Sequence, residues 1–251
     1  MDRSYETYQL LVRIMEELSK LNIPVVFKGA MTLKHVVAGW WAPMERGTKD
    51  IDMDWHGGTV SMEYLTMIIN TAVQRVGPGM AAVATREYTE NKTAGFNVMY
   101  NGQIVASLDV AVATAKSGPT AIYVTEHGVQ FVGSSLNRML ADKVTTAASG
   151  KIRRRIKDLC DLYILSFVPS FSSRAVFEIY AASGVELGNF SAMYDELPNL
   201  KHAYEVMTGV SMEFELTFEE VYARVMKFIQ PFINRDTRNL VWNGEEWAWV
   251  R

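Results

Sequence analysis

Cysteine is almost missing from this sequence, since Cys160 is the single example. One cysteine cannot form an internal disulfide, and it cannot build a zinc site of several thiolates. Long apolar runs are missing too, and no segment approaches the roughly 20 apolar residues that span a bilayer. The apolar residues near the N-terminus are interrupted by Arg13, Glu16 and Glu17, so there is no signal-peptide core. These absences predict a cytoplasmic protein without a membrane partner.

A strong net charge is also lacking, because the formal net charge of the 251 residues is -3. The overall composition therefore indicates no polyanionic partner, and a nucleic-acid surface would have to be a local basic patch. Internal repeats and low-complexity segments are absent. What remains is a chain that is 49% hydrophobic and 21% charged, which suits one large or two small globular domains.

The most informative stretch is an acidic alternation, Asp50-Ile51-Asp52-Met53-Asp54. In a β-strand successive side chains point to opposite faces, so the three aspartates would share one face. Neighbouring carboxylates repel one another, and aspartate has a poor β propensity. A cation such as Mg²⁺, which prefers oxygen ligands, would remove this repulsion. A solvated edge strand that uses charge against aggregation is the alternative interpretation.

A strand, a glycine turn and a helix come before the acidic stretch. The pattern predicts a short buried strand at 25–27, a turn at 28–30 and a helix at 31–37. The first backbone N–H groups of a helix are unpaired and attract anions, so a phosphate could lie on Gly29. An ordinary turn with a convenient glycine is the alternative, because one glycine is a weak signal.

A further aspartate, Asp109, lies in an otherwise apolar strand. The pattern predicts strands at 81–87, 96–100 and 104–112, and Asn101-Gly102 joins the last two in a hairpin. A buried carboxylate is costly unless it is paired or bound to a metal, so we expect Asp109 to face a cation. An aspartate that caps a strand end is the alternative.

The rest of the chain has a mainly helical pattern. After a hairpin at 121–132, Ser134 or Ser135 begins a helix that runs to about residue 148. Lys143 lies within the apolar stripe of this helix, where it must reach an anion or extend to water. Further helices are predicted at 151–162, 173–182, around 190–207 and at 218–232, and a hairpin flanked by tryptophans at 240–249. Those tryptophans are interpreted as packing anchors rather than a base-stacking platform.

A basic run opens the helix predicted at 151–162. Its cations are Lys151, Arg153, Arg154, Arg155 and Lys157. Such a run is commonly a solvated face, and Asp158 and Asp161 offer ion-pair partners on the same helix. The surplus cations could instead follow an RNA backbone. Cys160 lies on the apolar side of this helix and is interpreted as a buried residue, not a nucleophile.

Five short motifs follow one another along the chain. They read Lys28-Gly29-Ala30, Arg46-Gly47-Thr48-Lys49-Asp50-Ile51-Asp52, Leu108-Asp109-Val110, Ala141-Asp142-Lys143 and Arg155-Ile156-Lys157-Asp158-Leu159-Cys160-Asp161-Leu162. In this order the chain resembles the polymerase-β-like nucleotidyltransferases, and more closely the AbiEii-type toxins of abortive-infection and type IV toxin–antitoxin systems. The resemblance runs from about residue 20 to the end. It implies an α+β fold with a nucleotidyltransferase domain at 1–133, in which helices flank a mixed sheet, and a mainly helical domain with a terminal hairpin at 134–251.

The resemblance also implies a reaction, the transfer of a nucleoside monophosphate from an NTP to an acceptor hydroxyl. Asp50, Asp52 and Asp109 would bind two Mg²⁺ ions, and Asp109 would help to remove the proton of the acceptor. Lys143 would stabilise charge on the phosphates, and Asp158 would orient Lys143 or the acceptor. The implied nucleotide-binding residues are Lys28, Gly29, Ala30, Thr32, Arg46, Thr48 and Lys143.

Two residues depart from the family pattern. Ala30 replaces the second glycine of the turn, which could crowd the approach of a phosphate. Asp54 is an additional acid, which we expect to lie outside the metal ligands, either behind them or solvated.

The acceptor is left open by the sequence. Toxins of this group are thought to modify RNA, tRNA 3′ ends in particular, and the candidate RNA contacts are Arg153, Arg154, Arg155 and Lys157. A DNA-binding antitoxin encoded nearby is the expected protein partner. The alternatives are a nucleotidyltransferase that modifies a small molecule such as an antibiotic, and an inactive module that binds nucleotide or RNA.

Overall fold

The computed structural model describes residues 3–38, 44–88, 93–112, 118–207, 210–212 and 216–251. The chain forms two compact units. The first comprises Met1–Val36 and Gly47–Ser134, and the second comprises Val37–Arg46 and Ser135–Arg251. The assignment of catalysis to residues 1–133 stays a prediction. Among the described helices, none is both long and apolar enough to cross a membrane.

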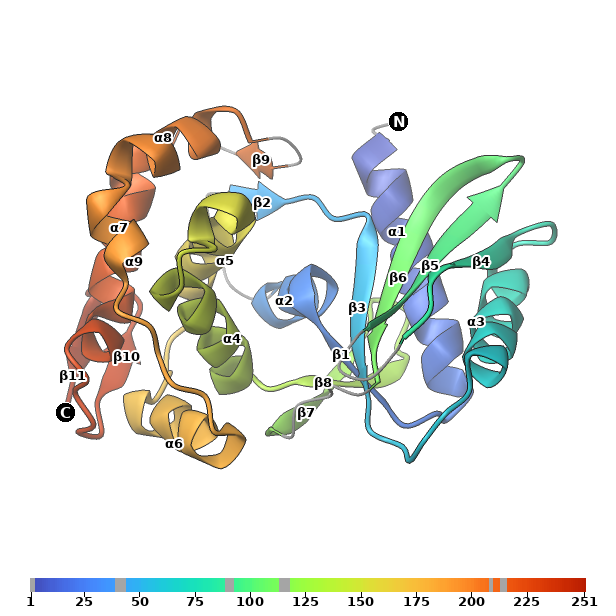
Figure 1. Ribbon diagram of the computed structural model, residues 1–251, viewed down its shortest axis with the longest axis horizontal. Helices are drawn as coiled ribbons and strands as arrows, with labels where there is room; N and C mark the ends of the chain where they lie inside the picture. Colours follow the sequence, from blue (N-terminus) through green and yellow to red (C-terminus); the bar gives the residue numbers. More distant parts are fainter. Residues whose placement is uncertain (1–2, 39–43, 89–92, 113–117, 208–209, 213–215) are drawn as a thin grey trace. The chain divides into compact units, whose positions relative to one another are not determined.

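A seven-stranded mixed sheet forms the centre of the first unit (Figure 1). Its strand order is β4-β5-β6-β3-β1-β8-β7. The strands are β1 (Val25–Lys28), β3 (Asp50–Trp55), β4 (Ala81–Arg86), β5 (Thr93–Tyr100), β6 (Gln103–Ala111), β7 (Thr120–Val124) and β8 (Gln130–Ser134). Strand β3 runs parallel to β6, and β1 runs parallel to β8, while the other neighbours are antiparallel. The expected α+β fold with a mixed sheet is confirmed.

One face of this sheet is apolar and covered by helices (Figure 1). The helices of the unit are α1 (Arg3–Lys20), α2 (Gly29–Val37) and α3 (Met62–Val76). Helical spacing places Leu11, Ile14 and Leu18 on one side of α1, and none of them is exposed. They share a core with Ile51 of β3 and Leu108 of β6. Burial of these side chains therefore fixes which face of the sheet is turned inward.

Strand β3 lies inside the sheet, between β6 and β1. The edge-strand interpretation of its aspartates is therefore wrong. Its side chains alternate as predicted, because Ile51 and Met53 enter the apolar core while Asp50 and Asp52 point to the opposite face. The sheet thus separates an apolar face from a polar one.

The predicted hairpins of this sheet are confirmed. Asn101 and Gly102 have φ angles of 50° and 76°, and positive φ at both central positions is what a type I′ turn requires. They join β5 to β6. Gly128, with a φ of 80°, lies in the turn between β7 and β8.

The second unit is mainly helical, as predicted. Its helices are α4 (Leu136–Ala148), the 3-10 helix η1 (Ile152–Arg155), α5 (Ile156–Leu165), α6 (Ser173–Ser183), α7 (Ser191–Asp195), α8 (Leu197–Glu205) and α9 (Phe218–Ile233). Strand β2 (Met44–Arg46) pairs with β9 (Val210–Met212), and β10 (Val241–Asn243) pairs with β11 (Ala248–Val250). Ser135 caps α4 by accepting a hydrogen bond from the backbone N–H of Arg138.

Two helix predictions differ from the structure. The three arginines of the basic run lie in η1 rather than in the first turn of α5, because the backbone of Arg155 leaves the helical region with φ −121° and ψ 40°. The segment around 190–207 is divided into α7 and α8. Pro198 lies in the first turn of α8, where a proline is tolerated because its missing N–H would be unpaired in any case.

The C-terminal hairpin is held by aromatic packing. Trp242 is 1% exposed, and its ring centroid lies 4.8 Å from that of Phe228 and 5.5 Å from that of Trp249. Its indole N–H donates to the carbonyl of Ser166 at 2.8 Å. The fully buried Arg224 donates to the same carbonyl at 2.9 Å. Trp242 and Trp249 are therefore packing anchors, as predicted.

Candidate active site

The polar face of the sheet carries a row of residues that crosses five neighbouring strands. The register pairs Arg86 with Gly95, Gly95 with Asp109, Asp109 with Asp52, and Asp52 with Lys28. Directly opposed residues point to the same face and have neighbouring Cβ atoms. Two carboxylates therefore lie side by side in the middle of the row, with a basic residue at each end. We call these five residues the acidic row.

Asp50 lies on the same face as the acidic row, two residues before Asp52 on β3. It is exposed and stands opposite Ser107 of β6. The hydroxyl of Thr48 donates a hydrogen bond to its carboxylate. The fold thus brings Asp50, Asp52 and Asp109 to one face, with Thr48 beside the first of them.

Gly29 makes room for the carboxylate of Asp52. It begins α2 with a φ of 70°, a left-handed conformation that residues with a side chain rarely adopt. A Cβ atom at this position would collide with Oδ2 of Asp52. Phosphate binding and an ordinary turn are the two expected reasons for Gly29. Close packing against an acid is a further reason for glycine here.

The next residues of α2 turn their side chains into the protein. Ala30 is 7% exposed, and Thr32 is fully buried. The Thr32 hydroxyl makes no hydrogen bond among the described residues. The backbone N–H groups of this turn, rather than these two side chains, are therefore the groups that a phosphate could reach.

Asp54 is buried rather than solvated. Its residue is 2% exposed, and the ammonium of Lys28 forms an ion pair with its carboxylate. The solvated interpretation of Asp54 is wrong, because Lys28 covers it from the neighbouring strand. The ammonium of Lys28, which is expected to contact the nucleotide, thus has a protein partner.

Asp109 faces a cation, as expected, and that cation is Arg86 of β4. A terminal nitrogen of Arg86 lies 2.6 Å from Oδ1 of Asp109. The Nε of the same guanidinium donates to the carbonyl of Thr93 at 2.8 Å. Arg86 is not among the predicted site residues, because nothing in the local pattern of β4 points it toward an acid.

Oxygen ligands for a divalent metal share this face, but they are not assembled into a complete site. Among the described side chains, no group of three or more His, Cys, Asp or Glu is placed to hold a metal ion. Asp50 is bonded to Thr48, and Asp109 is paired with Arg86. Carboxylates on one face still suit a hard cation such as Mg²⁺ in ligand type and in backbone position.

Lys143 belongs to the second unit, where two buried carboxylates hold it. Its ammonium lies 2.5 Å from Asp158 and 2.6 Å from Asp161, whose side chains are 4% and 0% exposed. Burial alone would lower the pKa of Lys143, but the charges of Asp161 and Asp158 raise this pKa above its ordinary value. Lys143 is thus a fixed, protonated ammonium and does not extend to water. Asp161 was outside the predicted site, although its spacing of one turn from Asp158 was the available signal.

The basic run is only partly neutralised. Arg153 and Arg155 each form an ion pair at 2.9 Å, with Glu196 and with an acid of α5. Within the described part of the chain, Arg154 is exposed and Lys157 is half-buried, and neither pairs with a carboxylate. Arg46 lies on β2, and its side chain is outside the described residues.

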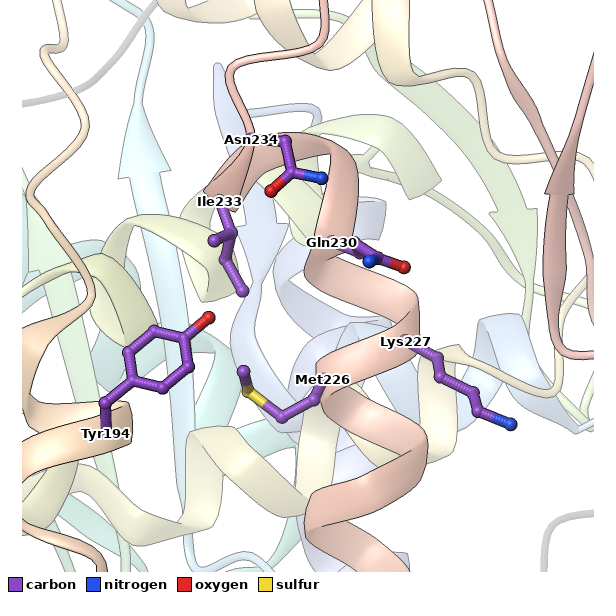
Figure 2. A pocket seen from close by; sticks show the side chains of 6 residues that line it. All are labelled: Tyr194, Met226, Lys227, Gln230, Ile233 and Asn234. Atoms are coloured by element: carbon purple, nitrogen blue, oxygen red, sulfur yellow. The ribbon is translucent and has the colours of Figure 1, made fainter.

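A shallow cavity of about 200 Å³ lies between α7 and α9 (Figure 2). It is lined by Tyr194, Met226, Lys227, Gln230, Ile233 and Asn234. Figure 2 shows the ammonium of Lys227 pointing away from Tyr194. None of the predicted site residues lines this cavity.

Comparison with known proteins identifies the family. The family model described as nucleotidyl transferase AbiEii toxin of type IV toxin–antitoxin systems matches residues 10–223, which include all five motifs. The chain belongs to this family. Among solved structures, MenT4, a nucleotidyltransferase toxin from Mycobacterium tuberculosis H37Rv, is similar with 13% sequence identity and a TM-score of 0.59. The similarity covers 98% of this chain and 87% of MenT4, and it shows a shared fold. No curated protein matches the chain.

The resemblance that the five motifs carry is thus confirmed. As an AbiEii family member, the protein is a nucleotidyltransferase toxin of a type IV toxin–antitoxin system. Membership implies an NTP substrate, in general a divalent metal, and an antitoxin partner.

Proposed function

We propose that this toxin transfers a nucleoside monophosphate from an NTP to an RNA hydroxyl, specifically at the 3′ end of tRNA, with two Mg²⁺ ions. The observation that carries the proposal is the direct pairing of Asp52 with Asp109 on the polar face, with Asp50 on the same side of β3. When bound, the metal ions would neutralise the triphosphate and align the attacking and leaving oxygens. These substrates place the proposed reaction in the cytoplasm.

The groups around the acids have distinct roles in this proposal. Asp109 accepts the proton of the attacking hydroxyl. The free N–H groups at the start of α2, beside Gly29, bind the β and γ phosphates, where the helix dipole is positive. Lys28, Arg46 and Thr48 supply further donors around the nucleotide, and Thr48 also holds Asp50.

Lys143 is proposed to stabilise the negative charge that develops on the phosphates. Its support is the ion-pair cluster with Asp158 and Asp161, which keeps the ammonium protonated and restricts its position. Asp158 and Asp161 are then positioning residues that act through Lys143.

The RNA is proposed to contact the basic run of residues 151–157. Arg154 and Lys157 support this assignment most directly, because no described carboxylate neutralises them. Arg153 and Arg155 would give up their ion pairs with carboxylates and bind RNA phosphates instead. Contacts with RNA phosphates release counterions, so the affinity should fall steeply as salt rises.

The test incubates the protein with each labelled NTP, Mg²⁺ and total cellular RNA, and separately with antibiotics in place of RNA. The expected result is labelled tRNA, loss of labelling with a chelator, and loss of labelling in Asp52→Asn at an unchanged melting temperature. Asp195→Asn is the control, because it removes one exposed carboxylate elsewhere. Undiminished labelling by Asp52→Asn would refute the metal assignment. Labelled antibiotic would favour the small-molecule enzyme, and no labelled product would favour the inactive binding module.

A further inference from the structure

We propose that Arg86 is a positioning residue of the acidic row, which holds the Asp109 carboxylate and releases it when a divalent cation binds. The inference rests on the proposed function, because it concerns a metal ligand named there. It goes beyond that proposal by adding a residue that competes with the metal.

A β-bulge directs Arg86 to the acidic face. Ala84 pairs with Phe96, which is 1% exposed and belongs to the apolar core. In a regular strand, residue 86 would point to the same apolar face, since the side-chain period is two. The register shifts between Ala84 and Arg86, so that Arg86 pairs with Gly95, the neighbour of Asp109. Bulges re-aim side chains in this way.

Gly95 leaves a path across β5 for this ion pair. A Cβ atom on Gly95 would lie 3.2 Å from Oδ1 of Asp109 and 3.3 Å from a terminal nitrogen of Arg86. These separations are shorter than comfortable van der Waals contact, so a side chain at this position would displace the guanidinium or the carboxylate. The hydrogen bond from Nε to the carbonyl of Thr93 fixes the guanidinium from its other side. The bulge, Gly95 and this hydrogen bond together direct the Arg86 guanidinium to the carboxylate of Asp109.

The charge of Arg86 has opposite effects in the two states of the site. In the metal-free protein it offsets the repulsion between Asp52 and Asp109, and it holds Asp109 in one orientation. Beside a bound dication the same guanidinium repels the metal. Removing Arg86 ends both its competition for Asp109 and its repulsion of the metal, and together these changes are expected to tighten metal binding about tenfold at the screening of a half-exposed site.

The experiment measures Mn²⁺ binding from the electron paramagnetic resonance of free Mn²⁺. Arg86→Ala should bind Mn²⁺ about tenfold more tightly than the original protein, whereas Arg86→Lys, which keeps the charge, should stay close to it. Arg75→Ala is the matched control. Arg75 lies on α3, over the apolar face, and its ion pair with Glu17 is long, at 3.8 Å. In an Asp109→Asn background, Arg86→Ala should have a smaller effect, because the competition for the carboxylate is gone and only the repulsion between the guanidinium and the metal is left to remove.

Unchanged or weaker Mn²⁺ binding by Arg86→Ala would overturn the inference, and so would a full tenfold tightening in the Asp109→Asn background. A protein that binds no Mn²⁺ would overturn the metal site together with the inference. Nucleotide transfer is measured separately. A protein that shows the expected changes in Mn²⁺ affinity but labels no acceptor would refute the proposed function and leave the assignment of Arg86 standing.

Discussion

The Lys143→Met substitution would remove the ammonium that lies between two buried carboxylates. Methionine keeps much of the length of the side chain but has no charge, so Asp158 and Asp161 would lose the ammonium between them, while Asp158 would keep the exposed Arg155. Removing one partner of a buried ion pair costs about 3–5 kcal/mol, because the remaining charge is uncompensated. At about 2–4 °C per kcal/mol for a protein of this size, the melting temperature should fall by roughly 6–20 °C.

Two further variants separate the contribution of Lys143 to stability from its role in the reaction. Adding Asp158→Asn and Asp161→Asn to Lys143→Met replaces the carboxylates by neutral amides, and this should restore most of the lost stability. It should not restore nucleotide binding, because no ammonium remains for the phosphates. Arg155→Ala is the control. Arg155 pairs with the same Asp158 but is 59% exposed, and surface ion pairs contribute only about 0–1 kcal/mol.

Thermal unfolding measures the first effect, and calorimetric titration with a non-hydrolysable NTP and Mg²⁺ measures the second. The raised pKa of Lys143 fixes the sign of the pH dependence. As pH rises, the unfolded chain loses this proton before the folded protein does, so stability declines only above the ordinary pKa of lysine. If Lys143→Met has the same melting temperature as the original protein, the buried ion pairs of Lys143 do not contribute the expected stability. A triple variant with the original nucleotide affinity would show that the ammonium serves only the fold.

Two further predictions concern the first unit. Gly29→Ala and Gly102→Ala each place a methyl group at a similar positive φ angle, so the backbone strain should lower the free energy of unfolding of each variant by about 1–2 kcal/mol. Only the methyl group at position 29 collides with Asp52, so only Gly29→Ala should weaken Mn²⁺ binding. Equal Mn²⁺ affinity of the two variants would contradict the role of Gly29. Burial lowers the pKa of His35, so below the ordinary histidine pKa the unfolded chain binds a proton that the folded protein does not bind. The free energy of unfolding should therefore fall as pH drops below that pKa, by at most about 1.4 kcal/mol per pH unit. His35→Gln should flatten this decline in acid-unfolding curves, whereas the same change at the exposed His202 should not.

Asp50 and Asp52 of the candidate site could be predicted from the sequence because their signals are local. Alternation alone places Asp50 and Asp52 on one face of β3, and the Asn101-Gly102 turn fixes β5 against β6. The position of Asp109 beside Asp52 is different, since it depends on parallel pairing between strands that are distant in sequence. Strand order is not contained in any local pattern. The expected cation, which needs a further ligand, and the family resemblance together placed these acids in one predicted site.

The partner of Lys143 shows the same limit in the second unit. The apolar stripe of α4 predicted that Lys143 faces inward, and this is what the structure shows. The expected anion was a triphosphate, and the structure adds two carboxylates of α5. Helical periodicity identifies the buried face of one helix, but it does not identify the element that packs against that face. The sequence shows that Asp158 and Asp161 lie one turn apart, but the predicted ion-pair partners of these acids are the arginines that precede them on the same predicted helix.

Arg86 could not be predicted at all, because the bulge in β4 breaks the periodicity on which such predictions depend. A side-chain period of two would point residue 86 to the same apolar face as Ala84. An arginine there, near the end of a strand, would be interpreted as a solvated residue. Gly95 is uninformative alone, because a glycine in a strand has many explanations. The two residues acquire a role only when the register places both in line with Asp109. The charges of this site therefore come from residues on several of the five strands in the acidic row, and the acidic motif of β3 supplies only some of them.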